Sequence, residues 1–178
     1  TITKPLSFNR LTNIIKSTGI SLGKQTVINY LGYITDSYLL FSIPNYAAKL
    51  ALKETSPKYY FMDTGFLELM LLDCKSAQLE NLVAIELIRR YGKDDVFYFE
   101  NNVEIDFYIP SEGLAVQVSM QVLDNIDTKE RETRAFIRLN NFIHLSKCIL
   151  ITNAEEAILD YEGITINVVP IWKWLLHD

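Results

Sequence analysis

The chain has 178 residues, a formal net charge of −5 and an apolar fraction of 49%, enough to bury one core or two small ones. It contains neither a signal peptide nor an apolar run long enough for a transmembrane helix, so no membrane partner is expected. Cys74 and Cys148 lack partners at metal or redox spacing, and His144 and His177 are too scattered for a zinc site, which favours a reducing cytoplasm. Because the first residue is Thr1 rather than Met, we expect a piece of a longer protein.

Charge is distributed unevenly along the chain. Residues 1–60 carry seven Lys or Arg and two acidic residues, whereas residues 61–178 carry ten basic and twenty acidic residues. This asymmetry predicts two modules, of which only the first has an electrostatic reason to approach nucleic acid. The acidic second module would repel phosphate unless metal ions intervene.

The first module begins with two amphipathic helices. Apolar residues at helical spacing predict one helix from Ser7 to Ser17, with Ser7 as its N-cap, and a second that begins near Ser21 and runs to about Ile34. Two β-rich runs follow, at residues 38–43 and 58–62. Helix, turn, helix and a two-stranded ribbon is the order of a winged helix, which we therefore predict for residues 1–62.

In a winged helix, the second helix and the wing contact DNA. The residues expected to do so here are polar or basic: Lys24, Gln25 and Asn29 on the helix, and Lys49, Lys53 and Lys58 on or beside the wing. A structural or protein-binding role for the module is an equally open alternative. The segment from Gly19 to Thr26 is not a phosphate-binding P-loop, because only three residues separate its glycines and Gln25 follows Lys24.

The second module alternates helices with strands. Periodicity predicts the following elements: helices at 66–72 and 78–91 with Gly92 as a C-cap, a strand at 96–99, a hairpin at 103–119, a helix at 128–142, strands at 147–152 and 164–169, and a helix at 171–176. From residue 78 the order is helix, three strands, helix, strand. That is the core order of the restriction-endonuclease-like fold, so we predict an α/β (α+β) domain of this kind over residues 63–178.

The hairpin carries the most informative polar residues. If its turn at residues 110–113 pairs Ile109 with Leu114, then Phe107 faces Val116 and Ile105 faces Val118 on an apolar surface. The other surface then places Asp106 opposite Gln117 and Glu104 opposite Ser119. Opposed side chains have Cβ atoms only about 5 Å apart, so carboxylates there could share a divalent ion.

Nucleases of this fold bind magnesium through an aspartate on the second strand and a Glu-x-Lys motif on the third, often with a glutamate from the first helix. Asp106 matches the aspartate, and Glu80, with Glu86 as second choice, matches the helix glutamate. Gln117 and Ser119 stand where the metal-binding Glu and the Lys are expected. An amide has no charge and a hydroxyl cannot replace an ammonium, so we expect Glu80, Asp106, Gln117 and Ser119 to be remnants of a motif rather than catalytic residues.

Five ordered motifs carry a resemblance to a known family. The chain resembles the C-terminal region, a domain of unknown function, of bacterial and archaeal AAA-type P-loop ATPases in these segments: Gly23-Lys-Gln-Thr-Val-Ile-Asn-Tyr-Leu31, Asp36-Ser-Tyr-Leu-Leu-Phe41, Tyr59-Tyr-Phe-Met-Asp-Thr-Gly65, Leu79-Glu-Asn-Leu-Val-Ala-Ile-Glu-Leu-Ile-Arg-Arg90 and Glu104-Ile-Asp-Phe107. The resemblance implies a preceding ATPase domain, absent here, that binds ATP. Many family members have Glu-Val-Lys where this chain has Gln117-Val-Ser119.

Two functions follow as expectations. The first is a non-catalytic regulatory or recognition region that binds DNA or a protein partner, contacts the missing ATPase domain and holds no cofactor itself. The alternative is a magnesium-dependent DNA endonuclease that binds metal through Glu80, Asp106 and Gln117 and takes its positive charge from Lys129, Arg131 or Arg134. Assembly through Trp172 and Trp174 is a third possibility, although such residues also pack on their own core.

Overall fold

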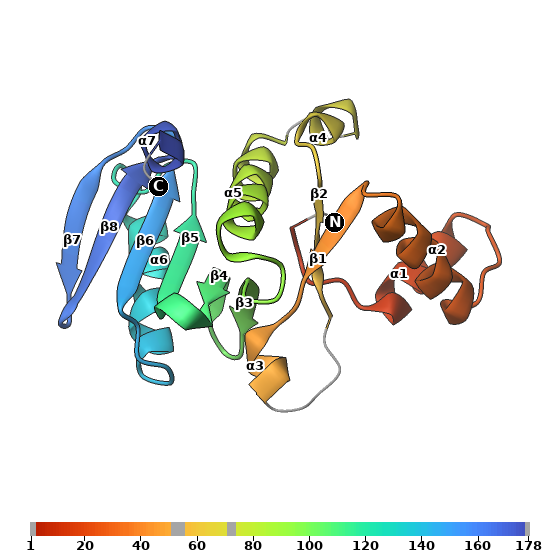
Figure 1. The fold of residues 1–178 in the computed structure, drawn as a ribbon, viewed down its shortest axis with the longest axis horizontal. Helices are drawn as coiled ribbons and strands as arrows, with labels where there is room; N and C mark the ends of the chain where they lie inside the picture. The colour runs from red at the N-terminus through yellow and green to blue at the C-terminus, as the bar shows by residue number, and fades with distance from the viewer. Residues whose placement is uncertain (1–2, 51–55, 71–73, 177–178) are drawn as a thin grey trace.

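The computed structural model describes residues 3–50, 56–70 and 74–176 (Figure 1). Its first part consists of α1 (Phe8–Ser17), α2 (Lys24–Asp36), β1 (Leu40–Ile43), α3 (Tyr46–Leu50) and β2 (Lys58–Phe61). The hydroxyl of Ser7 accepts a hydrogen bond from the Arg10 N–H at 3.2 Å, so the predicted N-cap is confirmed. The predicted start of α2 near Ser21 is wrong, because the helix begins at Lys24 with Gly23 as its N-cap.

The second part is built on a six-stranded sheet. Its elements are α4 (Gly65–Met70), α5 (Lys75–Tyr91), β3 (Phe97–Glu100), β4 (Glu104–Ile109), η1 (Pro110–Glu112), β5 (Leu114–Val118), α6 (Ile126–Asn140), β6 (Lys147–Thr152), β7 (Ala157–Tyr161), β8 (Ile164–Pro170) and α7 (Ile171–Leu176). The strand order is β3-β4-β5-β6-β8-β7, with β5, β6 and β8 parallel and the other pairs antiparallel. The predicted mixed α/β class and the order helix, three strands, helix, strand are confirmed. Residues 71–72 of the helix predicted at 66–72 lie outside the described residues.

Strand β7 is absent from the elements predicted above. It pairs with β8 at the sheet edge, and its residues are exposed or half-buried. A strand at a solvated edge does not need the clear apolar alternation from which strands are predicted.

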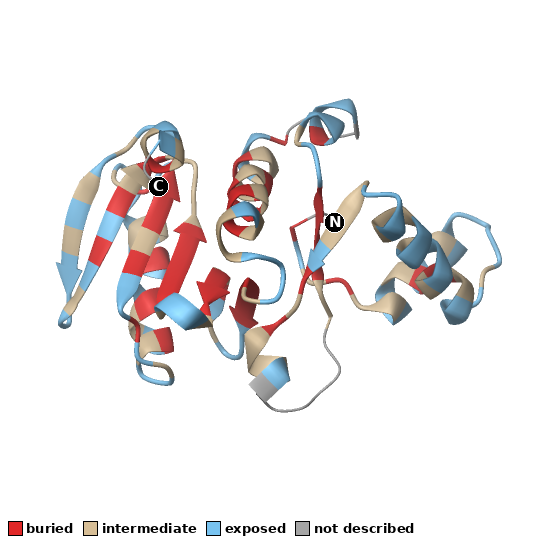
Figure 2. Cartoon of the chain, viewed as in Figure 1, coloured by how far each residue is buried: buried red, intermediate tan, exposed pale blue. Residues whose placement is uncertain are grey.

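Helices cover both faces of the sheet (Figures 1 and 2). Alternate residues of β5 point to opposite faces: Leu114 and Val116 join a core with Val83 and Leu87 of α5, whereas Ala115 joins a second core with Phe136 of α6. The sheet is therefore the middle layer of three. Side chains that project past its buried part, at the ends of β4 and β5, lie between α5 and α6.

One side chain of α5, Asn81, forms two hydrogen bonds to the backbone of the short β1–β2 sheet. Asn81 is fully buried on α5. Its Oδ1 accepts the Phe61 N–H at 2.7 Å and its Nδ2 donates to the Phe61 carbonyl at 2.9 Å, as a neighbouring strand would. Ile43 and Tyr60 of the same sheet share the core of α5 and β4. This attachment fixes the position of β2, and with it Lys58, relative to α5.

Replacing Asn81 with Leu should lower the free energy of unfolding by about 2–4 kcal/mol, because two buried backbone groups of Phe61 lose their partners. Chemical denaturation measures the change. The exposed Asn13, replaced by Leu on α1, is the matched control and should change stability by less than about 0.5 kcal/mol. An Asn81→Leu protein as stable as wild type would show that these two hydrogen bonds do not hold the β1–β2 sheet in place.

Candidate functional site

The hairpin of β4 and β5 opens at one end. The predicted pairing of Ile109 with Leu114 and of Phe107 with Val116 is confirmed, and the backbone pairs stop there. Ile105 does not continue that apolar surface, because it packs in the core on the α6 side. The prediction that Ile105 and Phe107 share one face is therefore wrong, and the two strands separate beyond Phe107.

Two polar side chains bridge the separated strands. The Gln117 Oε1 accepts the Asp106 N–H at 2.8 Å, and the Asp106 Oδ2 accepts the Val118 N–H at 3.0 Å. These contacts satisfy backbone groups that would otherwise pair along the ladder. Asp106 and Gln117 thus lie together as predicted, but one side-chain oxygen of each accepts a hydrogen bond from a backbone N–H.

Gln117 is used entirely for internal contacts. It is buried, and its Nε2 donates to the Glu104 carbonyl at 3.2 Å and to the Glu132 Oε2 at 2.9 Å. Glu132, on α6, accepts from the Arg131 guanidinium at 2.6 Å through its other oxygen. The amide therefore links β5, β4 and α6, and a carboxylate at position 117 would face a second carboxylate.

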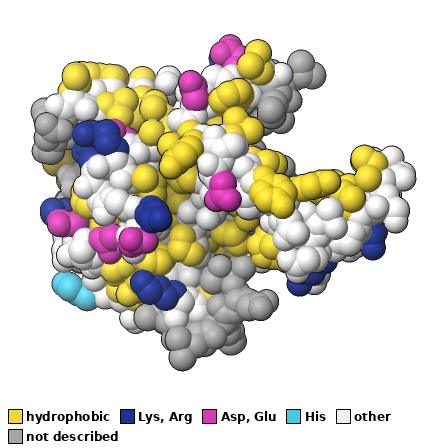
Figure 3. All heavy atoms as spheres, turned by 45° about the vertical axis from the view of Figure 1, so that its right-hand side comes forward, with side chains coloured by type: hydrophobic (Ala, Val, Ile, Leu, Met, Phe, Trp, Pro, Cys, Tyr) yellow, Lys and Arg dark blue, Asp and Glu magenta, His cyan; other side chains and the backbone are white. Residues whose placement is uncertain are grey.

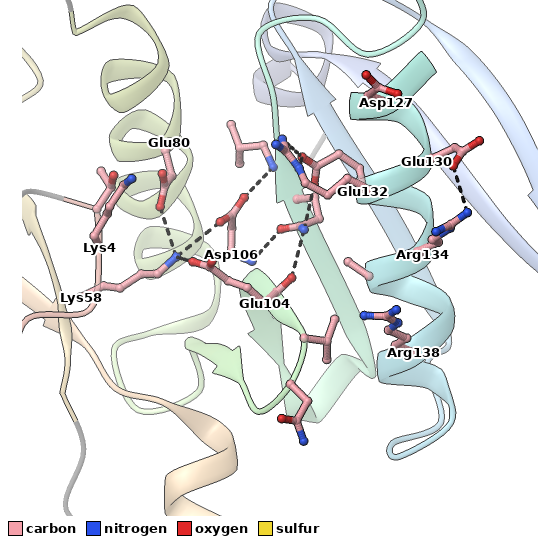
Figure 4. A pocket seen from close by; sticks show the side chains of 17 residues that line it. Lys4, Lys58, Glu80, Glu104, Asp106, Asp127, Glu130, Glu132, Arg134 and Arg138 are labelled. Carbon is pink, nitrogen blue, oxygen red and sulfur yellow. Dashed lines mark hydrogen bonds and ion pairs between the residues drawn. The ribbon is translucent and has the colours of Figure 1, made fainter. Parts of the chain in front are cut away.

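Lys58 lies at the centre of the acidic residues (Figure 4). Its side chain is only 1% exposed, and its Nζ lies 3.0 Å from Glu104, 3.4 Å from Asp106 and 3.7 Å from Glu80. The three carboxylates come from α5 and β4, whereas the ammonium comes from β2. This cluster is hereafter called the Lys58 cluster. It gives a buried cation the several oxygen neighbours that such a charge requires.

The protonation of the Lys58 cluster is set by burial and by the interactions among its charged groups. Burial, reinforced by the negative charge of Asp106, raises the pKa of Glu80 to about 8, against the opposing effect of Lys58. The Tyr60 hydroxyl donates to Glu80 at 2.9 Å. Despite its burial, the pKa of Lys58 is raised by Asp106, Glu80 and Glu104. At neutral pH the ammonium therefore faces a neutral Glu80, and burial also raises the pKa of Asp106, against the opposing effect of Lys58.

The Lys58 cluster forms one wall of a cavity of about 620 Å³, and α6 forms the other (Figure 4). The cavity contains both signs of charge, with Arg134 paired to Glu130 at 2.9 Å on the α6 side. The residues lining it are Thr3, Lys4, Lys58, Glu80, Asn102, Val103, Glu104, Asp106, Gln117, Val118, Asp127, Glu130, Arg131, Glu132, Arg134, Ala135 and Arg138.

Several predicted site residues lie elsewhere. Glu86, the second choice for the helix glutamate, pairs with Arg89 and Arg90 farther along α5. The Ser119 hydroxyl donates to the Gln121 carbonyl, and neither Ser119 nor Lys129 is among the described residues that line the cavity. Of the three candidate sources of positive charge, Arg131 and Arg134 line it.

The predicted nucleic-acid contacts separate into two groups. Lys24, Gln25 and Asn29 are exposed on α2, where Gln25 donates to Asn29 at 3.1 Å. Lys49 is exposed, with its Nζ 4.3 Å from the centre of the Phe97 ring, and Lys53 lies outside the described residues. Lys58 was expected on or beside an exposed wing, but its burial in the cluster leaves its ammonium unable to contact a nucleic-acid backbone on that surface.

Two important residues carried a signal in the sequence. Lys58 opens a strand whose other residues, Tyr59, Tyr60 and Phe61, are all buried, so its own burial could be anticipated. Glu132 lies four residues before Phe136 on the apolar stripe of α6, where an acidic residue requires a buried partner. Neither pattern identifies that partner.

No group of three or more His, Cys, Asp or Glu side chains in residues 3–50, 56–70 and 74–176 is arranged to hold a metal ion. Glu80 and Asp106, the two carboxylates among the expected metal ligands, both contact Lys58. Chemically, the arrangement can hold a proton on Glu80 and present charged groups of both signs to a ligand in the cavity.

The three-layer fold and the Lys58 cluster define an α+β protein with a buried lysine among acidic residues. The chain is similar to one family and one archaeal protein, both described without a function. Residues 2–78 match the family described as Domain of unknown function (DUF8612). The chain is 30% identical over 181 residues to Uncharacterized protein MJ1544 of Methanocaldococcus jannaschii, an alignment that covers 96% of this chain and 41% of that protein. No solved structure matches the chain. Within its described part, no helix is both long and apolar enough to cross a membrane.

Replacing Gln117 with Glu should destabilise the protein by about 2–4 kcal/mol at neutral pH, because the new carboxylate faces Glu132 and can no longer donate to it. Acid should reduce this loss, since protonation removes the repulsion. Urea denaturation at two pH values tests both parts. Gln121→Glu, at an exposed position of the same segment, is the control. A Gln117→Glu protein of unchanged stability would refute the structural role assigned to the amide.

Because its pKa is raised in the folded protein, Glu80 should make the free energy of unfolding decrease as pH rises. The folded protein holds the Glu80 proton up to about pH 8, whereas the unfolded chain releases it near its ordinary pKa of 4.5. Between these values the folded state binds more protons, so alkali favours unfolding. Lys58 adds no slope in this range, because its stabilisation is lost only above its ordinary pKa of 10.5.

Glu80→Gln should therefore remove a decline in the free energy of unfolding of about 3–4 kcal/mol between pH 5 and pH 8. Denaturation across that pH range measures it, with Glu68→Gln, at an exposed position of α4, as the control. Equal pH slopes in wild type and Glu80→Gln would contradict the assigned protonation of Glu80.

Proposed function

We propose that this chain is a non-catalytic recognition and regulatory region of an AAA-type P-loop ATPase. In this proposal residues 1–62 act as a winged helix and residues 63–178 as a nuclease-like domain that has lost its chemistry. Together they bind nucleic acid or a protein partner and communicate that state to an ATPase domain elsewhere in the same polypeptide. ATP would bind to that domain and not to this region.

The observation that carries the non-catalytic role is the position of the Lys58 ammonium. It lies within 3.7 Å of Glu80, Glu104 and Asp106, in the place where a nuclease would concentrate positive charge from metal ions. A cation that is covalently part of the chain neutralises the carboxylates without supplying an activated water. Gln117 adds to this argument, because its oxygen accepts from backbone and is turned away from any ligand role.

The order and packing of the elements support the rest of the proposal. Two helices precede a two-stranded sheet, as in a winged helix, and Lys24, Gln25 and Asn29 are exposed on the second helix. Lys58 and Asn81 join that two-stranded sheet to the nuclease-like part. A ligand that shifts one part therefore acts directly on the buried charges of the other, which is the physical requirement for regulation.

The alternative is a magnesium-dependent DNA endonuclease, and one observation favours it. Lys58 supplies a positive charge beside Asp106 and Glu80, the pair expected to bind metal, in a cavity also lined by Arg131, Arg134 and Arg138. A lysine from β2 could thus replace the one missing at Ser119. Metal binding decides between the two functions.

Calorimetric titration of Mg²⁺ and Mn²⁺ should show no binding to the wild-type chain or to Asp106→Ala. Lys58→Met, which frees three carboxylates, should gain Mn²⁺ binding, visible as a rise in Tm with added Mn²⁺. Lys58→Met should also lose about 3–5 kcal/mol of stability without metal, since buried carboxylates lose their cation.

Lys147→Met is the matched control, because Lys147 forms an exposed ion pair with Glu112 and should show neither effect. The proposal fails if the wild type binds Mn²⁺, Asp106→Ala does not, and the wild type cleaves DNA with the metal present. If Lys58→Met does not fold, the wild-type and Asp106→Ala titrations still decide.

A further inference from the structure

The two N-terminal helices have almost no core of their own. Among the described residues, α1 buries only Thr12 and α2 buries only Val27. The three clusters of buried side chains contain no residue of either helix. Helices of 10 and 13 residues are marginal in water without tertiary packing. These helices form the helical arm, defined here as residues 8–38. Most of the large apolar side chains of the arm are therefore not buried against the rest of the described chain.

The apolar side chains that this arm leaves exposed are large. They include Ile14 on α1, Ile20 between the helices, Tyr30 and Tyr33 on α2, and Tyr38 after it. Tyr33 is 65% exposed and Tyr38 is 78% exposed, and the rings of Tyr30 and Tyr33 lie 6.4 Å apart. Hydrophobic side chains form a band along the arm and onto the adjoining body (Figure 3). Exposed apolar groups gathered in this way mark a contact surface.

We propose that this apolar face docks against the ATPase domain of the same polypeptide, an inference that rests on the proposed function. The matched region is 41% of the archaeal relative, so more than half of that protein lies outside it, enough for another domain. Exposed tyrosines suit a protein-binding surface, because they bury large apolar areas and keep a polar tip. Phosphate contacts instead require clustered Lys and Arg.

The path of residues 3–6 also supports docking of the ATPase domain on the arm. The Thr3 N–H donates to the Tyr59 carbonyl and the Leu6 N–H donates to the Pro57 carbonyl, each at 3.2 Å, so residues 3–6 run beside β2 and lead directly into α1. An ATPase domain that preceded Thr3, as the resemblance implies, would be tethered a few residues from the arm. A short tether gives the tethered domain a high effective concentration at that face.

Hydrogen–deuterium exchange should compare the 178-residue chain with the longer polypeptide at the same low concentration. Amides of residues 13–38 should exchange at least about tenfold more slowly in the longer protein, because docking suppresses local opening of the helices. The double variant Tyr30→Ser, Tyr33→Ser should abolish most of this difference. Tyr161→Ser, on the edge strand β7 away from the arm, should leave it unchanged.

Equal exchange in the two proteins would overturn the inference. So would protection that grows with concentration in the 178-residue chain, because a second copy would then be the occupant. ATP hydrolysis by the longer protein separates this inference from the proposed function. If hydrolysis is absent while the exchange difference persists, the ATPase assignment fails and the arm docks on a different domain.

Discussion

The buried ammonium of Lys58 is the constraint on which the arrangement of this molecule depends. Three elements distant in sequence meet because β2 carries the cation and α5 and β4 carry its carboxylates. Removing either sign would leave unpaired charge where water is scarce, which costs far more than an exposed ion pair contributes. The two-stranded sheet is therefore held to the larger sheet by electrostatics as well as by the apolar contacts of Ile43 and Tyr60.

The cavity beside the Lys58 cluster is a consequence of how the hairpin ends. Because β4 and β5 stop pairing after Phe107 and Val116, side chains take over their backbone hydrogen bonds, and the strands separate toward α6. The same separation lets Asp106 reach Lys58 while Gln117 reaches Glu132. Asp106 and Gln117, which suggest a metal site in the sequence, therefore form hydrogen bonds that connect the hairpin to Lys58 on one side and to α6 on the other.

Periodicity predicted most of the second module, since long amphipathic helices and buried strands repeat at distinct spacings. Periodicity did not predict the start of α2 or the edge strand β7, because neither has a strong pattern of apolar residues. Local pattern also placed Asp106 near Gln117, as adjacent strands require. It could not place Lys58, since a contact across 48 residues depends on how β2 packs against the sheet, which spacing along the chain does not encode.

The hydrogen bond between Gln117 and Glu132 makes the residues acceptable at these two positions depend on each other. An amide at 117 is compatible with a buried carboxylate at 132, and a lysine at 58 is compatible with three nearby acids. Side chains in one hydrogen-bond or ion-pair network contribute non-additively, so we expect the stability effect of a substitution at one of these positions to depend on the residues at the others. A mutational route to a metal-binding site would pass through less stable intermediates, because each single step leaves a buried charge or dipole unmatched.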